Sequence, residues 1–388
     1  MHTNKRNWRL LFGLIGAVAS AAMCLLGGSR VRADSVPDGY SPKVVLHVDY
    51  GKTPDKIRVD WGSEETDPTS LQGIRVMGNR IYFLDDVADR VKQYHTSGKL
   101  VWETKSLDNL HYYAVAPDGK IYAVWGAGLE MFSCIDSSGN LVWAKDLRNI
   151  LSDEKSKAFG MRHCFQHFSW IEWTRRGAAI DVLCVGDKGS RSQCRAFVDG
   201  QGDLVGILPG ALATTDGTSY AMHPENPKDT SRNTYTLREI AGATLIGRDA
   251  AGKIVKKLRL DLTGKRVSRL AEDAVFTWIV ADPTGGFCVY GYARLPARAR
   301  FPKGLSSGLE EVLWRSNAQG KFKEEWRFVH SPFASRLPEV VVAPDGCVYH
   351  LKFGEKGIEV IKYSPTKKGK QSQGRRLVVR GGTRQSPG

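Results

Sequence analysis

After its first 33 residues, the sequence contains no apolar run long enough to span a membrane. It also lacks the His-Glu-x-x-His pattern of many zinc enzymes, a phosphate-binding loop and the glycine fingerprint of dinucleotide-binding folds. Helical periodicity is confined to one short candidate at residues 150–159, where Ser152 can serve as a cap. These absences argue against a membrane-embedded domain, a nucleotide-binding domain and a helical fold, and the sequence predicts neither a cofactor nor a metal.

Net charge is concentrated at the two ends of the chain. The sequence has 56 basic and 41 acidic residues, but segments 1–33 and 366–388 hold twelve of the basic residues and no acidic one. The body between them is nearly balanced, which argues against a specific nucleic-acid-binding surface. We expect 366–388, rich in Gly, Ser and Gln, to be a basic disordered tail. Such a tail can contact anionic lipid, cell-wall polymer or nucleic acid, and a solvated terminus is the simpler interpretation.

The N-terminal segment has the parts of a secretory signal. Lys5, Arg6 and Arg9 precede an apolar run over residues 10–26, and Val31-Arg-Ala33 supplies the small or aliphatic residues that a signal peptidase reads. We expect cleavage after Ala33 and export to the periplasm or the extracellular space, which leaves no transmembrane helix. An uncleaved anchor is the alternative, because a run of this length just suffices to cross a bilayer.

Few cysteines are present, and six of the seven lie beyond residue 33. An exported chain permits disulfides, although six cysteines allow 15 connectivities. Cys184 and Cys194 flank the turn 186–190, so they are the candidate pair across a predicted hairpin. Free buried thiols are the alternative, since a chain of this size can build a core without disulfides.

An internal repeat governs the body of the sequence. Similar stretches pair an apolar strand with a tight Asp/Asn/Gly turn and a second strand that carries Tyr at a near-constant offset; they lie at 76–82, 115–122, 213–220, 280–290 and 342–349, with a weaker copy at 170–180. Gly and Asn accept the backbone angles that tight hairpin turns need. A second hairpin follows most copies, as at 91–102 and 131–143. Four antiparallel strands that recur along the chain are typical of a β-propeller blade.

Counting the repeats predicts an all-β, six-bladed β-propeller over residues 34–365. Positions 82, 122, 180, 220, 290 and 349 mark the six blades. The last blade shows three clear strands, and segment 43–48 can supply the fourth and close the ring. Seven or eight blades are the alternative, because segments 146–166, 222–236 and 292–310 leave room for a degenerate blade.

One part of the repeat resembles a known family. The stretch 67–100 is similar to an NHL repeat, with Asn79, Ile81, Tyr82, Asp85, Arg90, Val91 and Gly98 at the matching places. The match is partial in blades two and six. The resemblance implies a propeller scaffold that in most relatives binds proteins, RNA or glycans, and in a minority resembles lactonases and lyases with a channel metal. Gly98 to Trp102 and Gly139 to Trp143 also look like the Gly-x-x-x-Trp signature of quinoprotein propellers, whose Trp docks neighbouring blades.

Candidate binding residues gather on one expected rim, where the loops before the first strand and after the second strand of each blade meet. They are Asp86, Arg90, His111, Tyr112, His167 and Arg336. The alternative is that Asp85 or Asp86 and Arg90 only tie their loop together. The spacing of His163, Cys164 and His167 is compatible with metal binding, but no third ligand position is specified, so we expect ordinary loop residues. Glu172 and Glu339 are the carboxylates expected on inner strands.

These observations favour binding over catalysis. We expect a monomeric, exported module that recognises a protein or cell-envelope partner through one rim, with no specific nucleic-acid binding. The first alternative is a lactonase- or lyase-like hydrolase with a channel metal, and the second is a quinoprotein-like redox propeller. No catalytic residue follows from the sequence.

Overall fold

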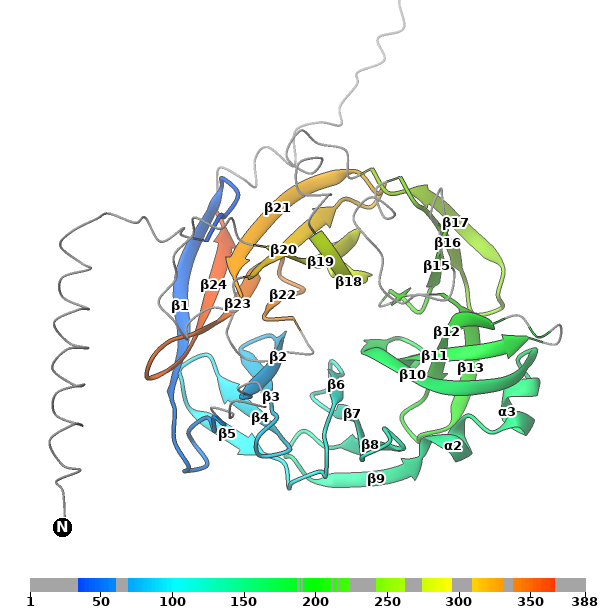
Figure 1. Ribbon diagram of the computed structural model, residues 1–388, viewed down its shortest axis with the longest axis horizontal. Coiled ribbons are helices and arrows are strands. Elements are labelled where there is room, and N and C mark those ends of the chain that lie inside the picture. Colours follow the sequence, from blue (N-terminus) through cyan, green and yellow to red (C-terminus); the bar gives the residue numbers. More distant parts are fainter. Residues whose placement is uncertain are drawn as a thin grey trace, which may run out of the picture.

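Six four-stranded antiparallel sheets surround a central axis in the part of the chain that the structure describes (Figure 1). The structure is a computed structural model, and it describes residues 34–60, 69–186, 189, 191–210, 212–214, 216–223, 242–261, 274–294, 309–330 and 338–366. The predicted signal at 1–33 lies outside these residues, as does the predicted tail beyond 366. The predicted six-bladed β-propeller is confirmed, and the alternative of seven or eight blades is not.

Each blade runs outward from an inner strand. Blade one contains β2 (Leu71–Met77), β3 (Arg80–Asp85), β4 (Arg90–His95) and β5 (Leu100–Glu103). Blade two contains β6 (Tyr112–Val115), β7 (Ile121–Trp125), β8 (Met131–Ile135) and β9 (Leu141–Asp146). Blade three contains β10 (Met161–Thr174), β11 (Gly177–Gly186), β12 (Arg191–Val198) and β13 (Leu204–Pro209).

The remaining blades follow the same plan. Blade four contains β14 (Leu212–Ala213), β15 (Ser219–His223), β16 (Thr244–Arg248) and β17 (Ile254–Arg259). Blade five contains β18 (Ala274–Ala281), β19 (Phe287–Arg294), β20 (Leu309–Ser316) and β21 (Phe322–Val329). Blade six contains β22 (Val340–Val342), β23 (Val348–Phe353), β24 (Gly357–Pro365) and, from the other end of the chain, β1 (Tyr40–Asp49).

The closure of the ring was predicted correctly. Strand β1 runs antiparallel to β24, from Tyr40 opposite Pro365 to Asp49 opposite Gly357. Segment 43–48 therefore supplies the fourth strand of blade six, as the repeat count required. Pairing the two ends of the chain covers the outer edge of β24, which would otherwise expose unpaired backbone groups.

The repeated turn residues explain why the blades form. Between the third and fourth strands of blade two, Asp136 Oδ1 accepts hydrogen bonds from the N–H groups of Ser138 (2.8 Å) and Asn140 (2.9 Å). Gly139 within this turn has a φ of 87°, which a residue without a Cβ adopts freely. The equivalent acceptors in blades three to five are Asp199, Asp249 and Asn317. The sequence pattern thus encodes the same side-chain-to-backbone turn four times.

The core lies between blades. The six marker positions of the repeat all lie on second strands and are buried: Tyr82, Tyr122, Ile180, Tyr220, Tyr290 and Tyr349. The two Gly-x-x-x-Trp segments dock neighbouring blades as expected. The Trp143 indole N–H donates to the Gly200 carbonyl of blade three (3.0 Å), and a Cβ on Gly139 would lie 3.0 Å from the Trp102 ring of blade one.

Two short helices, α2 (Leu147–Ile150) and α3 (Asp153–Lys157), connect blades two and three. The expected helix at 150–159 is thus present in part, and its cap residue Ser152 makes no side-chain cap bond, whereas Asp146 caps α2. No helix in the described part of the chain is long and apolar enough to cross a membrane.

Candidate functional site

A cavity of about 450 Å³ lies in the central channel. Inner strands from all six blades contribute to its wall, with part of β19 behind them. The wall is mostly apolar, and its main polar groups come from Arg75 on β2, Glu172 on β10 and Tyr290 on β19. Cavities of this size and character are the usual binding places for small molecules in folded proteins.

Three prolines of the repeat surround the mouth of this cavity. Pro117, Pro283 and Pro344 each line the cavity, and each is exposed to solvent. Each occupies the second position of the four-residue turn that follows an inner strand. In each turn the N–H of the fourth residue donates a hydrogen bond of 2.9 Å to the carbonyl of the first. Proline fits this position because its fixed φ matches the turn. The cavity therefore opens on the face of the first-to-second-strand turns, where Met77 and Trp173 complete an apolar border.

Arg75 places a positive charge on the channel wall. Gly73, with a φ of 59°, lies at a bulge in β2, and the strand resumes its pairing from Ile74 onward. Arg75 Nη1 donates to the Ile74 carbonyl at 3.0 Å, and its guanidinium lies 5.6 Å from the centre of the Tyr113 ring. Burial lowers the pKa of Arg75, while Tyr113, Tyr290 and Glu172 act in the opposite direction. A buried cation of this kind is stabilised by an anionic partner, which takes the place of the water that burial removes.

Glu172 lines the same wall from blade three. Its Oε1 accepts a hydrogen bond from the Ala213 N–H of blade four at 2.8 Å, and Arg195 Nη2 lies 3.9 Å away. The side chain is 14% exposed, and burial raises its pKa although Arg195, the Ala213 N–H and Arg75 act against that shift. The sequence-based placement of Glu172 at the channel is confirmed by its position on the cavity wall.

A second polar cluster lies behind the wall, between blades five and six. Glu311 lies on β20, His330 follows β21, and Glu339 precedes β22. One ligand atom from each residue lies within 4.8 Å of the other two, and all three side chains are buried. His330 Nδ1 lies 3.4 Å from Glu339 Oε2, and the Glu339 N–H donates to Glu311 Oε2 at 3.2 Å. Among the described residues, this is the one group with the donor types and spacing of a metal site.

The charges of this cluster act on one another. Burial and the neighbouring Glu339 raise the pKa of Glu311, with His330 acting against them. Burial lowers the pKa of His330, but Glu339 and Glu311 outweigh it, so the net shift is upward. Tyr292 packs against the imidazole, with ring centres 4.7 Å apart. Positive charge is therefore favoured at this point between the carboxylates.

The predicted rim residues lie on the opposite face. Asp86 and Arg90 flank the β3–β4 turn, and the next connection leads to His111 and Tyr112 at the start of β6. Hydrogen bonds from the N–H groups of Leu107 and Leu110 to Asp89 hold these two loops together. His167 lies on β10 with its side chain outside the described set, and Arg336 lies outside the described residues altogether.

The rim residues of blade one make contacts that secure their own loop. Arg90 forms an ion pair with Glu103 of the same blade. Asp85 Oδ2 lies 2.9 Å from the Lys92 ammonium, and Asp85 Oδ1 accepts from the Ala88 N–H at 3.2 Å. These contacts support the alternative that Asp85 and Arg90 tie their own loop together. The rim as a binding surface stays a prediction.

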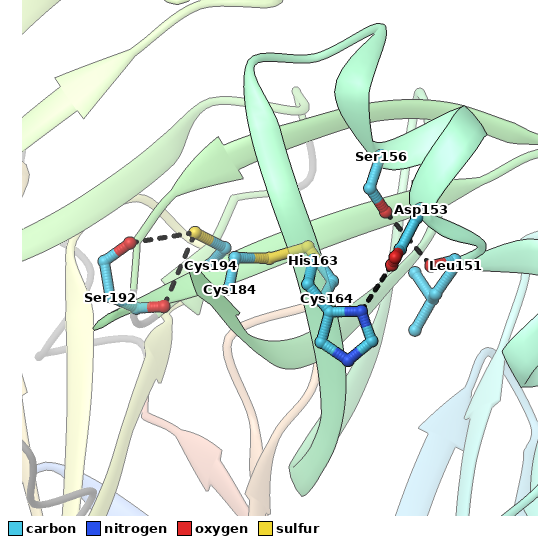
Figure 2. Close-up of a disulfide and its surroundings, with 8 residues drawn as sticks. All are labelled: Leu151, Asp153, Ser156, His163, Cys164, Cys184, Ser192 and Cys194. Carbon is cyan, nitrogen blue, oxygen red and sulfur yellow. Dashed lines mark hydrogen bonds and ion pairs between the residues drawn. A yellow bond between two sulfur atoms is a disulfide. The ribbon is translucent and has the colours of Figure 1, made fainter. Parts of the chain in front are cut away.

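The predicted disulfide partner was wrong. Cys184 is bonded to Cys164 on the neighbouring strand β10, not to Cys194 (Figure 2). Across the β11–β12 hairpin Cys184 faces Ser192, whereas Cys194 faces Val182 and remains a buried free thiol. The register of this hairpin, with Val185 opposite Arg191, leaves the two cysteines two positions out of alignment. Cys164 and Cys184 are instead direct partners in the β10–β11 ladder.

The extended conformation of β10 also determines where the side chains of His163 and Cys164 point. Successive side chains of a strand point to opposite faces, so His163 and Cys164 diverge. His163 pairs with Asp153 on α3, and Cys164 turns to the disulfide (Figure 2). Because this segment is a strand and not a helix, the i, i+4 spacing of His163 and His167 does not place them on one helix face.

Comparison with known proteins gives only distant structural similarity. No protein-family model matches the sequence, and neither does any curated protein sequence. Among solved structures, hydrazine synthase from Kuenenia stuttgartiensis is 13% identical with a TM-score of 0.38, over 75% of this chain and 76% of that chain. A luciferin-regenerating enzyme is 10% identical with a TM-score of 0.42, over 79% and 95%. Regucalcin, a calcium-binding protein from Agrobacterium tumefaciens, is 14% identical with a TM-score of 0.37, over 76% and 91%.

Proposed function

We propose that this chain is an exported binding propeller that holds a small organic anion with an apolar body in its central cavity. The observation that carries the proposal is a cavity of about 450 Å³ whose apolar wall includes one guanidinium, that of Arg75. The apolar border of Met77, Pro117, Trp173, Pro283 and Pro344 suits a hydrophobic body. Arg75 supplies a charge-assisted hydrogen bond to an acidic group.

Binding suits this cavity better than metal-dependent hydrolysis. A channel metal needs several oxygen or nitrogen ligands that converge on one point. Among the described residues that line the cavity, Glu172 is the one carboxylate, and it already accepts the Ala213 N–H. A protein or cell-envelope partner on the Asp86 to Tyr112 rim remains a separate prediction, as do export and the NHL resemblance.

The test is titration calorimetry with two probes of equal length, octane-1-sulfonate and octan-1-ol. We expect saturable sulfonate binding that Arg75→Gln weakens by about 10–100-fold, since a hydrogen bond to a charged group contributes roughly 1.5–3 kcal/mol. Octanol affinity should change little in the same variant. The matched control is Arg148→Gln, which removes the same charge from an exposed side chain outside the cavity. Equal sulfonate affinities of Arg75→Gln and the control, or no saturable binding of either probe, would overturn the proposal.

A further inference from the structure

The cluster of Glu311, His330 and Glu339 is independent of the cavity ligand. All three side chains are nearly inaccessible, at 1%, 6% and 1% exposure. Two carboxylates at such close range cost free energy when both are ionised in a buried place, unless a positive charge lies between them. Glu311 Oε1 in particular has no hydrogen-bond partner in the described structure. A buried oxygen of this kind normally has a partner.

We propose that Glu311, His330 and Glu339 bind one divalent transition-metal ion, zinc being the best fit, which links blade five to blade six. Zinc is held in proteins by imidazole nitrogen and carboxylate oxygen at about 2.0–2.2 Å in tetrahedral geometry, which places neighbouring ligand atoms about 3.3 Å apart. His330 Nδ1 and Glu339 Oε2 already lie 3.4 Å apart. A shift of at most about 1.5 Å by side-chain rotation brings the Glu311 carboxylate to the spacing of about 3.3 Å set by tetrahedral zinc, because no ligand atom of the group lies more than 4.8 Å from another.

The donor set selects the class of metal. One imidazole with two carboxylates suits zinc and similar transition ions, whereas calcium and magnesium prefer an all-oxygen shell. Charge agrees with this choice, because the two negative charges of the carboxylates cancel the charge of a dication while the imidazole stays neutral. Buried charge is tolerated when it is paired in this way.

The position of the cluster indicates a structural role. Two ligands come from blade five and the third from the entry to blade six. Blade six is the blade that β1 closes, so an ion here would fasten the joint beside the ring closure. Pro338 and Val340 line the cavity on either side of Glu339, and the cluster itself is not part of the cavity wall. The ion would therefore stabilise the ring without contacting a ligand in the channel.

A shared proton is the competing explanation. In that arrangement a charged His330 pairs with Glu339, and Glu311 stays protonated. The response of the protein to zinc separates the two explanations. Replacing a metal ligand removes the response to zinc, whereas replacing an unwanted buried carboxylate by its neutral isostere raises the thermal midpoint without any metal.

The experiment strips the full chain with a chelator, dialyses it, and measures the thermal midpoint before and after zinc is added back and the excess removed, together with the metal then bound. We expect one equivalent of zinc by elemental mass spectrometry and a zinc-induced rise of roughly 5 °C or more, with no comparable rise in calcium or magnesium. Glu311→Gln and His330→Gln should each lower zinc affinity by at least roughly tenfold and remove the rise.

Glu310→Gln is the matched control, because Glu310 is the adjacent residue of β20 and pairs with Arg327 at 3.5 Å. The zinc-induced rise in thermal midpoint should persist in Glu310→Gln, whatever the midpoint of that variant is without zinc. A wild-type midpoint that zinc does not change, combined with a higher midpoint of Glu311→Gln in chelator, would establish the shared proton and overturn the metal site. A zinc response that survives in both ligand variants would place the ion elsewhere and equally overturn it.

Discussion

Arg315 Nε lies 2.7 Å from Asp282 Oδ2, and both side chains are 1% exposed. The same guanidinium donates to Glu324 Oε2 at 2.9 Å and to the Tyr40 hydroxyl at 3.2 Å. Asp282 follows β18, Arg315 is the next-to-last residue of β20, and Tyr40 begins β1. One buried cation therefore joins the inner and outer parts of blade five to the strand that closes blade six.

Replacement of this cation should be strongly destabilising. Arg315→Met leaves the buried Asp282 without its positive partner and Glu324 with the positive charge of Lys323 alone. Breaking a buried pair on one side typically costs about 3–5 kcal/mol. We expect a loss of that size in the free energy of unfolding, measured by urea denaturation. Arg148→Met provides the comparison, because Arg148 forms an exposed ion pair with Asp146 and should change stability little. Equal losses in the two variants would contradict the role given to Arg315.

The disulfide makes a separate prediction about covalent pairing. Peptide mapping without reduction should recover Cys164 linked to Cys184 and Cys194 as a free thiol. The double change Cys164→Ala/Cys184→Ala should lower the free energy of unfolding by about 3 kcal/mol, since the bond closes a loop with a sequence separation of 20. Cys194→Ala should leave the disulfide intact. Recovery of a peptide that links Cys184 to Cys194 would refute this pairing.

The local repeat made the scaffold predictable. Asp136 and Gly139 specify their turn through contacts within five residues, and Tyr82 or Tyr349 mark second strands wherever the pattern recurs. Closure of the ring by segment 43–48 could be predicted because the last blade needed a fourth strand. Such features depend on short sequence distances and on counting, which a single sequence supplies.

The site depends on what lies across the ring. Arg75 and Glu172 come from different blades and share one cavity, and Pro117 reads in sequence as a turn residue only. Glu311, His330 and Glu339 meet between two blades, so no spacing rule indicates their contact. Two adjacent glutamates in the buried strand at 309–316 are a signal that could have drawn attention to the cluster, beside Glu339. Cys184 was assigned the wrong partner because a shift of two residues in the register of a hairpin cannot be read from cysteine spacing.

Removal of the closing strand should prevent correct folding. Strand β1 pairs with β24 along its length, and Leu46 and Val48 are buried in the core of blade six. A chain that begins at residue 50 would expose the β24 edge and this apolar surface. We expect it to aggregate or elute as oligomers in size-exclusion chromatography, while a chain that lacks only 367–388 elutes as the full-length protein does. A monomeric and stable chain without β1 would show that closure is dispensable.

Binding of an anion in the cavity should strengthen as the pH falls. Burial raises the pKa of Glu172, so this carboxylate takes up its proton at a pH above that of an ordinary glutamate, about 4.5. Above that pKa the ionised Glu172 partly offsets Arg75 and repels the ligand; below it the opposing charge is gone. A sulfonate ligand stays ionised throughout, so any change in its affinity between pH 8 and pH 5 reports on the protein.

We expect octane-1-sulfonate affinity to rise a few-fold over this range, since removing one unit charge at such distances changes the interaction by about 1 kcal/mol. Glu172→Gln should bind at pH 8 as tightly as the unaltered protein binds at low pH, and its affinity should not vary with pH. Arg75→Gln should bind weakly at every pH. The measurement is calorimetry across the pH series. An affinity that falls on acidification would mean that a group other than Glu172 controls the charge of the cavity, and so would a Glu172→Gln variant that keeps the pH dependence.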